Sequence, residues 1–399
     1  MDYDKTVALC ALNKIFGYHP RLGLNLIGDD VLSLFSTPQE VPGHPELALQ
    51  LTPASLEWAV KELARVKELG FRFLSILDED YPPVLRECED PPLGLYLNGS
   101  SSATEIFSLR PLVAFVGTRD MSPYGKVWCR KLVRALADSP IQPVIVSGLA
   151  FGVDAVAHRS ALEFGLPTVG VMATGIDQVY PWQHERLAMD MVRTPGSGVV
   201  TDYPLDTAPV ALNFLRRNRI IAGLSRAVVV VESKTRGGSL MTARYASEYD
   251  RDLYAVPGRL DDERSAGCNS LIREHMAEII TTPEDLAARL GLRPPHRRPG
   301  GSWAAGAKES SVAAGTGTGG AGERPDLLRA ALRRCFGASS AAEAVALAVR
   351  SQRGARPEEL AALTSRPIDE VLSAIGQLEA HGYLSTDLLQ RSTLSPPWD

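Results

Sequence analysis

The sequence lacks long hydrophobic runs and any recognisable export signal. In 399 residues the longest apolar run, around residues 227–231, is far shorter than the roughly 20 residues that a membrane-spanning helix needs. The first residues, MDYDKTVALCALNK, carry two acids and offer neither a basic start nor a cleavage site, so we expect no secretory signal. The expectation is a globular protein that makes no use of a membrane.

Cysteine is also scarce and unpaired in the sequence. The five cysteines are Cys10, Cys88, Cys129, Cys268 and Cys335. An odd count without a CxxC pair argues against a disulfide framework and a structural zinc site, and predicts a cytoplasmic protein without a metal. Asp154 and His158, four residues apart on one helix face, are two conceivable metal ligands. Because no third ligand is in view, a hydrogen-bonded structural pair is the favoured interpretation.

The nucleotide-binding and hydrolytic fingerprints are missing as well. No G-x-G-x-x-G follows an early strand, which removes the main support for a nicotinamide or flavin cofactor. Gly125 and Lys126 resemble part of a phosphate loop, but Asp120 stands where its first glycine belongs and Val127 where its hydroxyl belongs. HExxH and GxSxG are absent too. We therefore expect no cofactor and no catalytic residue.

The chain divides by pattern into four segments. Residues 1–70 read as short helices and a longer one over Pro53–Leu69, which predicts a helical domain of the SAM or helix-hairpin-helix type. A contact of this domain with DNA is the less favoured interpretation. Residues 71–290 alternate apolar strands with amphipathic helices, which predicts an α/β, extended Rossmann-like, doubly wound and mostly parallel sheet. A helix is expected over Asn269–Ile280.

The last two segments are a linker and a small helical unit. Residues 291–324 are rich in Gly, Ala, Pro and Ser, which is typical of a flexible linker. In residues 325–399, helices over Pro357–Leu363 and Ile368–His381 with a following strand predict a winged helix. Its second helix carries acids and no Lys or Arg, so a protein contact is favoured over reading of a DNA groove.

Small-residue turns follow the predicted parallel strands at their carboxyl ends. These turns are Gly117-Thr118-Arg119, Ser147-Gly148-Leu149-Ala150-Phe151-Gly152, Thr174-Gly175 and Gly237-Gly238-Ser239. Ligands of open parallel sheets bind at this edge, where glycine lets backbone N–H groups approach an anion and helix N-termini add partial positive charge. One such turn is weak evidence, because tight turns use glycine anyway. Four in register indicate a phosphate-binding face.

Positive charge is concentrated in one stretch of a chain whose net charge is −5. Between residues 214 and 244 a single acid, Glu232, accompanies seven basic residues: Arg216, Arg217, Arg219, Arg226, Lys234, Arg236 and Arg244. A solvated turn at residues 216–219 is one interpretation; the favoured one is that some of these arginines, with Arg119, bind phosphates. Several phosphates along a chain indicate a polynucleotide. Aromatic side chains at 151, 180, 182 and 214 offer stacking faces for bases, although core packing is their more common role.

Longer motifs carry a family resemblance. They read LDEDYPPVL (77–85), VGTRDMSPYG (116–125), VSGLAFGVDAVAHRSAL (146–162), GIDQVYPWQH (175–184), RRNRIIAGLS (216–225), ESKTRGGSLMTARYA (232–246), YAVPG (254–258) and GCNSLI (267–272). Together they resemble the DNA-processing protein A family, also called DprA or Smf. The resemblance covers about residues 71–280. Leu215, where relatives often have proline, and Thr118, where many have serine, are mild departures.

The resemblance implies a recombination mediator and not an enzyme. Such proteins bind and protect incoming single-stranded DNA in natural transformation, load the RecA recombinase in place of single-strand-binding protein, and dimerise through the Rossmann-like domain. Carried onto this sequence, the family's DNA pocket and its neighbours fall on Gly117, Thr118, Arg119, Ser147, Gly148, Gly152, Arg216, Arg217, Asn218, Arg219, Lys234, Gly237, Gly238 and Ser239.

Two other functions remain open from the sequence. The sheet is similar to that of nucleotide phosphoribohydrolases, whose PGGxGTxxE motif supplies a catalytic glutamate. Here the corresponding stretch reads RGGSLMTARYA and has no acid before Glu248, which disfavours hydrolysis. The third possibility is a scaffold that acts mainly through the predicted winged helix.

Overall fold

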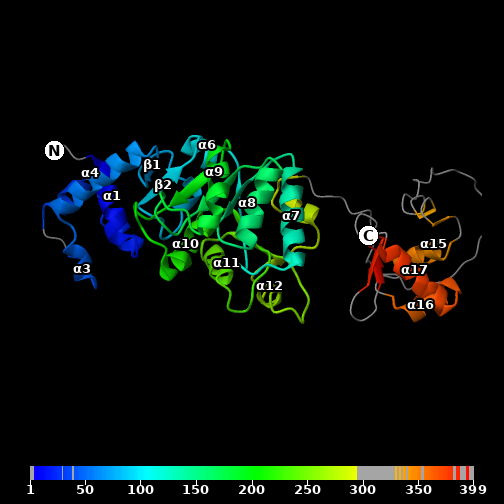
Figure 1. Cartoon of the computed structure of the whole chain (residues 1–399). Helices are drawn as coiled ribbons and strands as arrows, with labels where there is room; N and C mark the ends of the chain where they lie inside the picture. Colours follow the sequence, from blue (N-terminus) through cyan, green and yellow to red (C-terminus); the bar gives the residue numbers. More distant parts are fainter. Residues whose placement is uncertain are drawn as a thin grey trace, which may run out of the picture. The chain divides into compact units, whose positions relative to one another are not determined.

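The computed structural model describes residues 4–28, 30–37, 40–293, 329, 332–333, 336–337, 340–351, 355–380, 383–386 and 392–394. The chain separates into two compact units, residues 1–302 and 303–399, each of which is described by itself (Figure 1).

The first unit is built on a single sheet. Within residues 40–293, which are described without a gap, nine strands pair in the order β1-β2-β6-β5-β4-β3-β7-β8-β9. Their bounds are β1 Arg72–Ser75, β2 Gly94–Asn98, β3 Leu112–Val116, β4 Val144–Ser147, β5 Thr168–Val171, β6 Gly198–Thr201, β7 Ala227–Val230, β8 Asp252–Ala255 and β9 Glu278–Ile279. The pairs β1–β2 and β2–β6 are antiparallel and all other pairs are parallel. The predicted doubly wound, mostly parallel sheet is confirmed.

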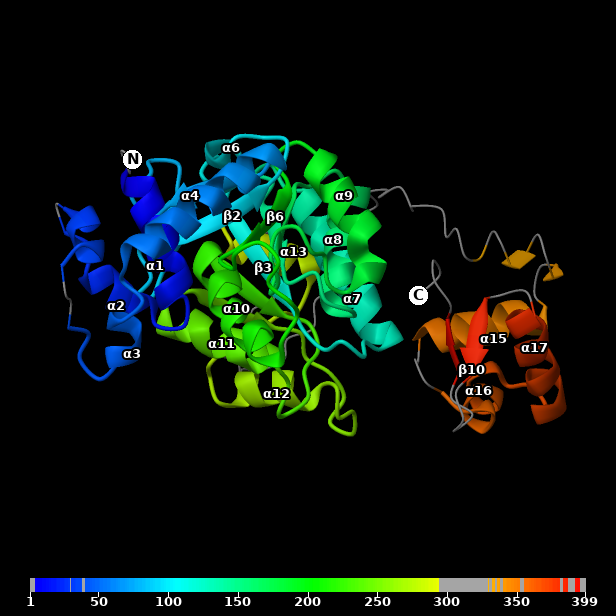
Figure 2. The same ribbon diagram turned by 60° about the vertical axis from the view of Figure 1, so that its left-hand side comes forward.

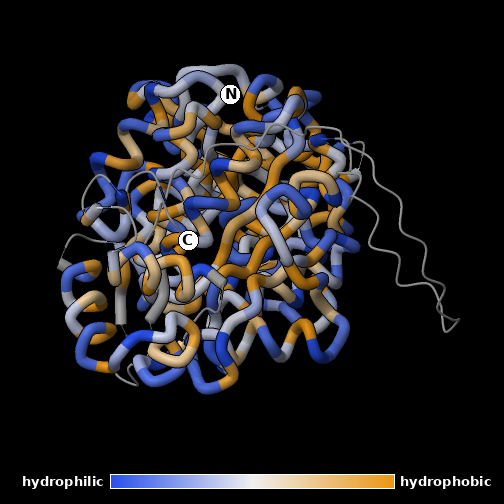
Figure 3. The backbone as a smooth tube through the Cα atoms, turned by 90° about the vertical axis from the view of Figure 1, so that its right-hand side faces the viewer, coloured by the Kyte–Doolittle hydropathy of each residue, from blue (hydrophilic) through white to orange (hydrophobic). Residues whose placement is uncertain are grey.

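Helices cover both faces of this sheet. Their bounds are α5 Pro83–Arg86, α6 Ala103–Phe107, α7 Pro123–Ala137, α8 Val153–Glu163, η2 Trp182–His184, α9 Glu185–Arg193, α10 Ala211–Leu224, α11 Ser239–Glu248, α12 Ala266–Arg273 and α13 Pro283–Arg289. Along β3, Ala114 packs into the core that α10, α11 and α12 share, and the next residue, Phe115, into the core under α7, α8 and α13. Figure 2 shows α10, α11 and α12 on one side of the sheet and α7 and α8 on the other. Burial on both faces explains why the central strands are continuously hydrophobic (Figure 3).

The N-terminal helices pack onto the antiparallel edge of the sheet. They are α1 Lys5–Phe16, α2 Pro20–Asn25, η1 Val31–Phe35, α3 Pro45–Ala48 and α4 Pro53–Glu68. Buried side chains of α1, such as Leu12 and Phe16, belong to the same hydrophobic core as Leu95 of β2. Asn13 of α1 accepts from the N–H of Gly94 over 3.1 Å. These helices and the sheet therefore form one packed unit, and the domain boundary at residue 70 stays a prediction.

The end of the sheet differs from the sequence prediction. The helix expected over Asn269–Ile280 ends at Arg273, and the chain then forms β9. His275 has a left-handed backbone with φ 57°, which ends the helix. The N–H of Ala277 donates back to the carbonyl oxygen of Leu271 over 3.1 Å and turns the chain toward β8. The apolar residues among 277–280 therefore belong to a strand and its flanking turn, and the prediction of a further helical turn there is wrong.

The second unit contains helices and a two-stranded antiparallel ribbon. The described elements are α15 Ala341–Ser351, α16 Pro357–Thr364, α17 Ile368–Ala380, β10 Leu384–Thr386 and β11 Ser392–Leu394. The two helices and the strand expected for a winged helix lie at the predicted places, and the helices share one hydrophobic core. The winged-helix assignment itself stays a prediction. The predicted linker lies outside the described residues from residue 294 onward.

No helix in the described ranges is long and apolar enough to cross a membrane. Four of the five cysteines lie in these ranges, and all four, Cys10, Cys88, Cys129 and Cys268, are buried free thiols. Burial raises the pKa of each of these thiols, so they pack as apolar groups.

Asp154 and His158 have separate hydrogen-bond partners, so the favoured prediction of a hydrogen-bonded pair is wrong. Among the described residues no group of three His, Cys, Asp or Glu side chains is placed to hold a metal. The ring nitrogen Nδ1 of buried His158 lies 2.7 Å from the hydroxyl of Thr168, which itself donates to the carbonyl oxygen of Ile145. His158 therefore donates from Nδ1 and is neutral. Burial, with the nearby His184 and Arg217, lowers its pKa to about 3.

This histidine predicts a loss of stability in mild acid. The folded-state pKa of about 3 lies below the ordinary value of 6.5, so the stabilisation is complete above pH 6.5 and is lost as pH falls from there toward 3. The slope of the unfolding free energy from this one group reaches about 1.4 kcal/mol per pH unit. His158→Asn keeps a donor near Nδ1 without the titration, so urea unfolding from about pH 7 to about pH 5 should lose this slope.

The exposed His275 provides the control, because His275→Asn should keep the pH slope of the wild type. If the free energies of unfolding of wild type and His158→Asn changed with pH in parallel, the lowered pKa assigned to His158 would be wrong.

Candidate nucleic-acid interface

One cavity lies where the winding of the sheet changes direction. From β3 the chain adds β4, β5 and β6 on one side, and it then returns to add β7 and β8 on the other. Ligands of doubly wound sheets bind in the crevice at such a switch point, outside the carboxyl ends of the strands. A cavity of about 440 Å³ lies there, between the turns that follow β3 and β7.

The cavity contains most of the residues that the sequence singled out. Its lining includes Gly117, Thr118, Arg119, Arg217, Asn218, Lys234, Gly237, Gly238 and Ser239. Ser147, Gly148, Gly152, Arg216 and Arg219 do not line it. Four polar lining residues, Asp154, Ser233, Thr235 and Thr242, were not anticipated at this cavity. The signal for Ser233 and Thr235 was their place in the turn between β7 and α11, and Thr242 lies one helical turn beyond Ser239.

Two glycines allow the turns after β3 and β4 to touch. Gly152 has φ 76°, and a Cβ atom there would lie 2.1 Å from the carbonyl oxygen of Thr118. A Cβ atom on Gly117 would lie 2.4 Å from the side chain of Val153. No larger residue fits at either place, so these glycines set the shape of the cavity wall.

Several backbone N–H groups of these turns already have acceptors. The N–H of Thr118 donates to the carbonyl oxygen of Glu232 over 2.8 Å. The N–H groups of Gly148 and Ala150 donate to the carboxylate of Asp154 over 3.1 and 3.3 Å. These N–H groups hold the turns together and are not free for a ligand.

The start of α11 supplies partial positive charge to the cavity. The start of a helix carries the positive end of its dipole. The N–H groups of Leu240 and Met241 in this first turn already donate to the carbonyl oxygens of Gly237 and Gly238, each over 3.1 Å. Gly238 is the N-cap of α11 and Ser239 its first residue, and both line the cavity. Asn218 of α10 donates to the carbonyl oxygen of Gly238 over 3.3 Å, and the hydroxyl of Ser239 donates to that of Ser233 over 2.8 Å. The helix end is thereby fixed against α10.

Exposed cations lie at the same cavity. The guanidinium of Arg119 lies 5.3 Å from the centre of the Phe214 ring, and no carboxylate pairs with it among the described residues. Arg236 is likewise exposed without a carboxylate partner in the described chain. Lys234 lies 3.8 Å from Glu263, and because both side chains are more than half exposed this pair is weak. These cations are available to an anionic ligand.

Arg217 lies beneath the cavity and its side chain is almost fully buried. One guanidinium nitrogen, Nη1, donates to the carbonyl oxygen of Gly148 over 2.6 Å and also to that of Val171. A Cβ atom on Gly148 would lie 2.2 Å from this nitrogen, so glycine is required there. Arg217 therefore joins the ends of β4 and β5 instead of presenting an open guanidinium.

Asp154 is the electrostatic partner of Arg217. Burial lowers the pKa of Arg217 to about 10, although the charge of Asp154 acts in the opposite direction. Burial raises the pKa of Asp154, and the charge of Arg217 with the two N–H donors opposes this shift. Arg217 stays protonated at neutral pH, and the two opposite charges support each other inside the protein.

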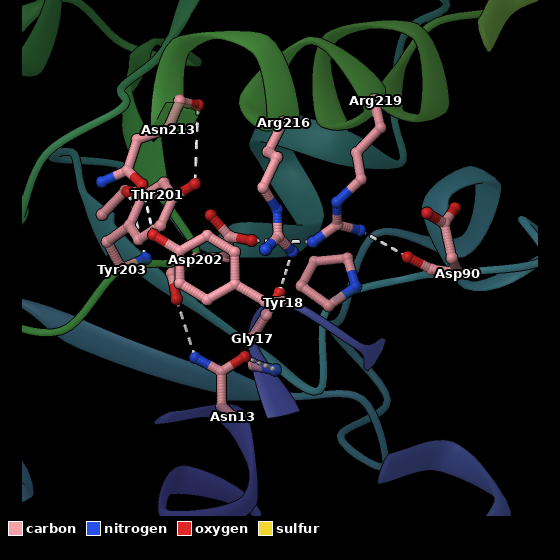
Figure 4. Close-up of polar contacts among 12 residues, drawn as sticks. Asn13, Gly17, Tyr18, Asp90, Thr201, Asp202, Tyr203, Asn213, Arg216 and Arg219 are labelled. Atoms are coloured by element: carbon pink, nitrogen blue, oxygen red, sulfur yellow. Dashed lines mark hydrogen bonds and ion pairs between the residues drawn. The ribbon is translucent and has the colours of Figure 1, made fainter. Parts of the chain in front are cut away.

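Arg216 points from α10 toward the N-terminal helices, and Arg219 toward the carbonyl oxygen of Asp90 (Figure 4). Arg216 donates to the carbonyl oxygen of Gly17, and its guanidinium lies 3.9 Å from the centre of the Tyr18 ring. Arg219 forms a buried ion pair with Asp202 over 2.7 Å. The basic run is thus part of a helix and not a solvated turn, and its members diverge because successive helical residues point in different directions.

The fold and the cavity together define a Rossmann-like protein with a crevice, lined by exposed cations, at the switch point of its sheet. Residues 72–291 match the family model described as DNA recombination-mediator protein A. This is more than half of the chain, and the chain belongs to that family.

Individual relatives agree with this assignment. Protein Smf of Synechocystis is 41% identical over 223 residues, which are 56% of this chain and 55% of that protein, so the match spans about half of the relative's length. The crystal structure of DNA processing protein A from Streptococcus pneumoniae is 35% identical, covers 70% of this chain and 92% of its own, and has a TM-score of 0.54. A DNA processing protein A from Helicobacter pylori with a single-stranded DNA binding mode is 30% identical, covering 55% of this chain and 95% of its own with a TM-score of 0.49.

Arg217 and Arg119, one buried and one exposed at the cavity, predict effects of very different size on stability. Arg217→Met leaves the carboxylate of Asp154 buried without its charge partner, which should lower the free energy of unfolding by about 3–5 kcal/mol. Arg119→Met replaces an exposed side chain and should change the free energy of unfolding by no more than about 0.5 kcal/mol. Urea unfolding of both variants at pH 7.5 measures the difference.

The double variant Arg217→Met/Asp154→Leu tests the coupling between the charges. It should be more stable than the sum of the single changes predicts, because it removes both charges together. A stable Arg217→Met protein would show instead that the guanidinium is not needed inside the fold.

Proposed function

We propose that this protein binds single-stranded DNA in the cavity between β3 and β7 and acts as a recombination mediator. In this function it protects the strand and loads the RecA recombinase onto it in place of single-strand-binding protein. The observation that carries the proposal is the exposed, unpaired guanidinium of Arg119 beside the ring of Phe214 at the cavity.

The chemistry of the cavity suits the backbone of a nucleic acid. Arg119 and Arg236 offer forked donors for phosphate oxygens, and the start of α11 offers the positive end of its dipole. Contacts of this kind carry no sequence information and release counterions. We therefore expect binding that depends little on sequence and strongly on salt.

An unpaired strand fits this chemistry better than a duplex. Phe214 lines the cavity, and its ring contacts that of Tyr180 edge to face at 5.4 Å between centroids. Unpaired bases stack on such rings, whereas the bases of a duplex are stacked on each other and lie behind its phosphates. Family membership favours the same substrate, because the Helicobacter pylori relative binds single-stranded DNA.

The remaining parts of the proposal concern organisation and partners. We infer a homodimer through the Rossmann-like domain, which would place two cavities on one strand and raise the avidity. The proposed domains are a helical one over residues 1–70, the DNA-binding one over 71–290, a linker over 291–324 and a winged helix over 325–399. The acids Asp369 and Glu370 in the first turn of α17 favour a protein contact for the last of these. The location we infer is the cytoplasm, where single-strand-binding protein and RecA compete for the strand.

Hydrolysis of a nucleotide is the less favoured function. Among the residues that line the cavity, Asp154 is the single carboxylate. It is buried, accepts two backbone N–H groups and faces Arg217, so it has no freedom to act on a substrate. The turn before α11 supplies no second acid.

Charge reversal at Arg119 should weaken the binding of single-stranded DNA. Arg119→Glu replaces a phosphate donor by a repelling carboxylate, which predicts an increase in Kd of about 10- to 100-fold and a shallower salt dependence. Fluorescence anisotropy with single- and double-stranded oligonucleotides of equal length, titrated across salt, measures both quantities. The same variant should fail to start RecA filaments on DNA coated with single-strand-binding protein.

Arg110→Glu is the matched control. Arg110 is exposed and directly precedes the residues leading into β3, so it lies at the opposite end of that strand from Arg119. Wild-type affinity of Arg119→Glu would show that DNA does not bind in this cavity. Release of the free base from a nucleoside 5′-monophosphate would show instead that the protein is a hydrolase.

A further inference from the structure

A second cavity adjoins the first and has no role in the function proposed above. It measures about 620 Å³ and lies between α7 and α8, beside η2. Arg119 lines both cavities, so the two are adjacent at this residue.

The second cavity has a positive electrostatic character. Four basic residues line it, Arg119, Lys126, Arg130 and Arg159, against two acids, Asp120 and Glu163. Both acids are already engaged, Asp120 with Arg264 at 2.9 Å and Glu163 with Arg130. Lys126 and Arg159 are exposed, and neither has a carboxylate partner among the described residues. Two unpaired cations on neighbouring helices suit successive phosphates of one strand.

Exposed aromatic rings lie beside these cations. Phe151 lines the second cavity with 43% of its surface exposed, and its ring contacts that of His184 at 4.9 Å between centroids. Trp182, two residues before His184, is 74% exposed. Tyr180, which contacts Phe214 of the first cavity, is 45% exposed. Exposed rings near basic groups are typical of single-strand binding surfaces.

The turn that carries Phe151 is held rigidly. Leu149 has a left-handed backbone with φ 59°, which is costly for a residue with a branched side chain. Its side chain is fully buried, and its carbonyl oxygen lies 2.8 Å from Nδ1 of His184. Gly152 ends the turn with φ 76°. Contacts on both sides of Phe151 hold the strained backbone in place. The ring of Phe151 itself stays at the surface.

We propose that the second cavity binds the continuation of the DNA strand held in the first cavity. In this arrangement the strand passes Arg119, its phosphates contact Lys126 and Arg159, and one base stacks on Phe151. The inference rests on the function proposed above and adds to it the path of the strand and the need for a longer ligand. Charge complementarity and the shared lining residue carry it.

The test compares short and long oligothymidylates on the full-length protein. Lengths of about 4 and about 12 nucleotides span the site sizes of single-strand binding folds. Arg159→Glu should leave the Kd for the short oligonucleotide within about twofold and weaken the long one by about tenfold, with a salt slope lower by about 0.7. Phe151→Ala should weaken the long one alone, by about fivefold to tenfold and without a change in salt slope.

Controls separate this inference from the proposed function. Arg110→Glu and Leu109→Ala change an exposed cation and an exposed apolar side chain before β3, and both should bind both lengths like the wild type. Unchanged binding of the long oligonucleotide by Arg159→Glu and Phe151→Ala, or equal losses for both lengths, overturns the second cavity as the strand path. If Arg119→Glu also binds both lengths normally, the first cavity fails as well, and with it the proposed function.

Discussion

The two opposite charges buried at Arg217 and Asp154 form the interaction on which the candidate site depends. Arg217 reaches from α10 to the carbonyl oxygens that follow β4 and β5, and Asp154 on α8 holds the N–H groups of Gly148 and Ala150. A buried charge that lacks its partner is strongly destabilising, so each of the two residues fixes the other. Two helices and two strand ends are thereby locked at the edge of the sheet where the cavity lies. The open cations around the cavity are then presented by a frame that does not need to rearrange.

Helix α10 connects this frame with the rest of the first unit. Phe214 and Asn218 face the cavity, Arg217 faces the strand ends, and Arg216 and Arg219 face the N-terminal helices and Asp202. Asp202 itself follows β6, and its carbonyl oxygen accepts from Asn13 of α1 over 2.8 Å (Figure 4). The N-terminal helices are therefore tied to the same helix that forms the floor of the cavity. Their packing contributes to the position of Phe214 even though none of their residues lines this cavity.

The sequence predicted the sheet and the place of the cavity because both follow from local signals. Continuous apolar strands and small-residue turns after them put Gly117, Arg119 and Gly238 at one edge, where the structure brings them together. It did not predict which arginines stay open. The burial of Arg219 depends on Asp202, and that of Arg217 on Asp154, and no local pattern links residues so far apart in the sequence. The helix over residues 211–224 was not predicted either, because its charged middle hides the apolar face that packs on the sheet.

Buried and exposed arginines therefore serve different purposes in this protein. A guanidinium that already has carbonyl and carboxylate partners gains little from a phosphate, because it would have to give up bonds inside the fold to make new ones. Arg119 and Arg159 give up only water, so a phosphate there yields a net gain that falls as salt competes with it. Since the frame is formed in advance, little of the binding free energy is spent on ordering the protein. Affinity should then scale with the number of open cations that a strand can reach at once, which makes the length of the ligand, and not its sequence, the variable to which binding responds.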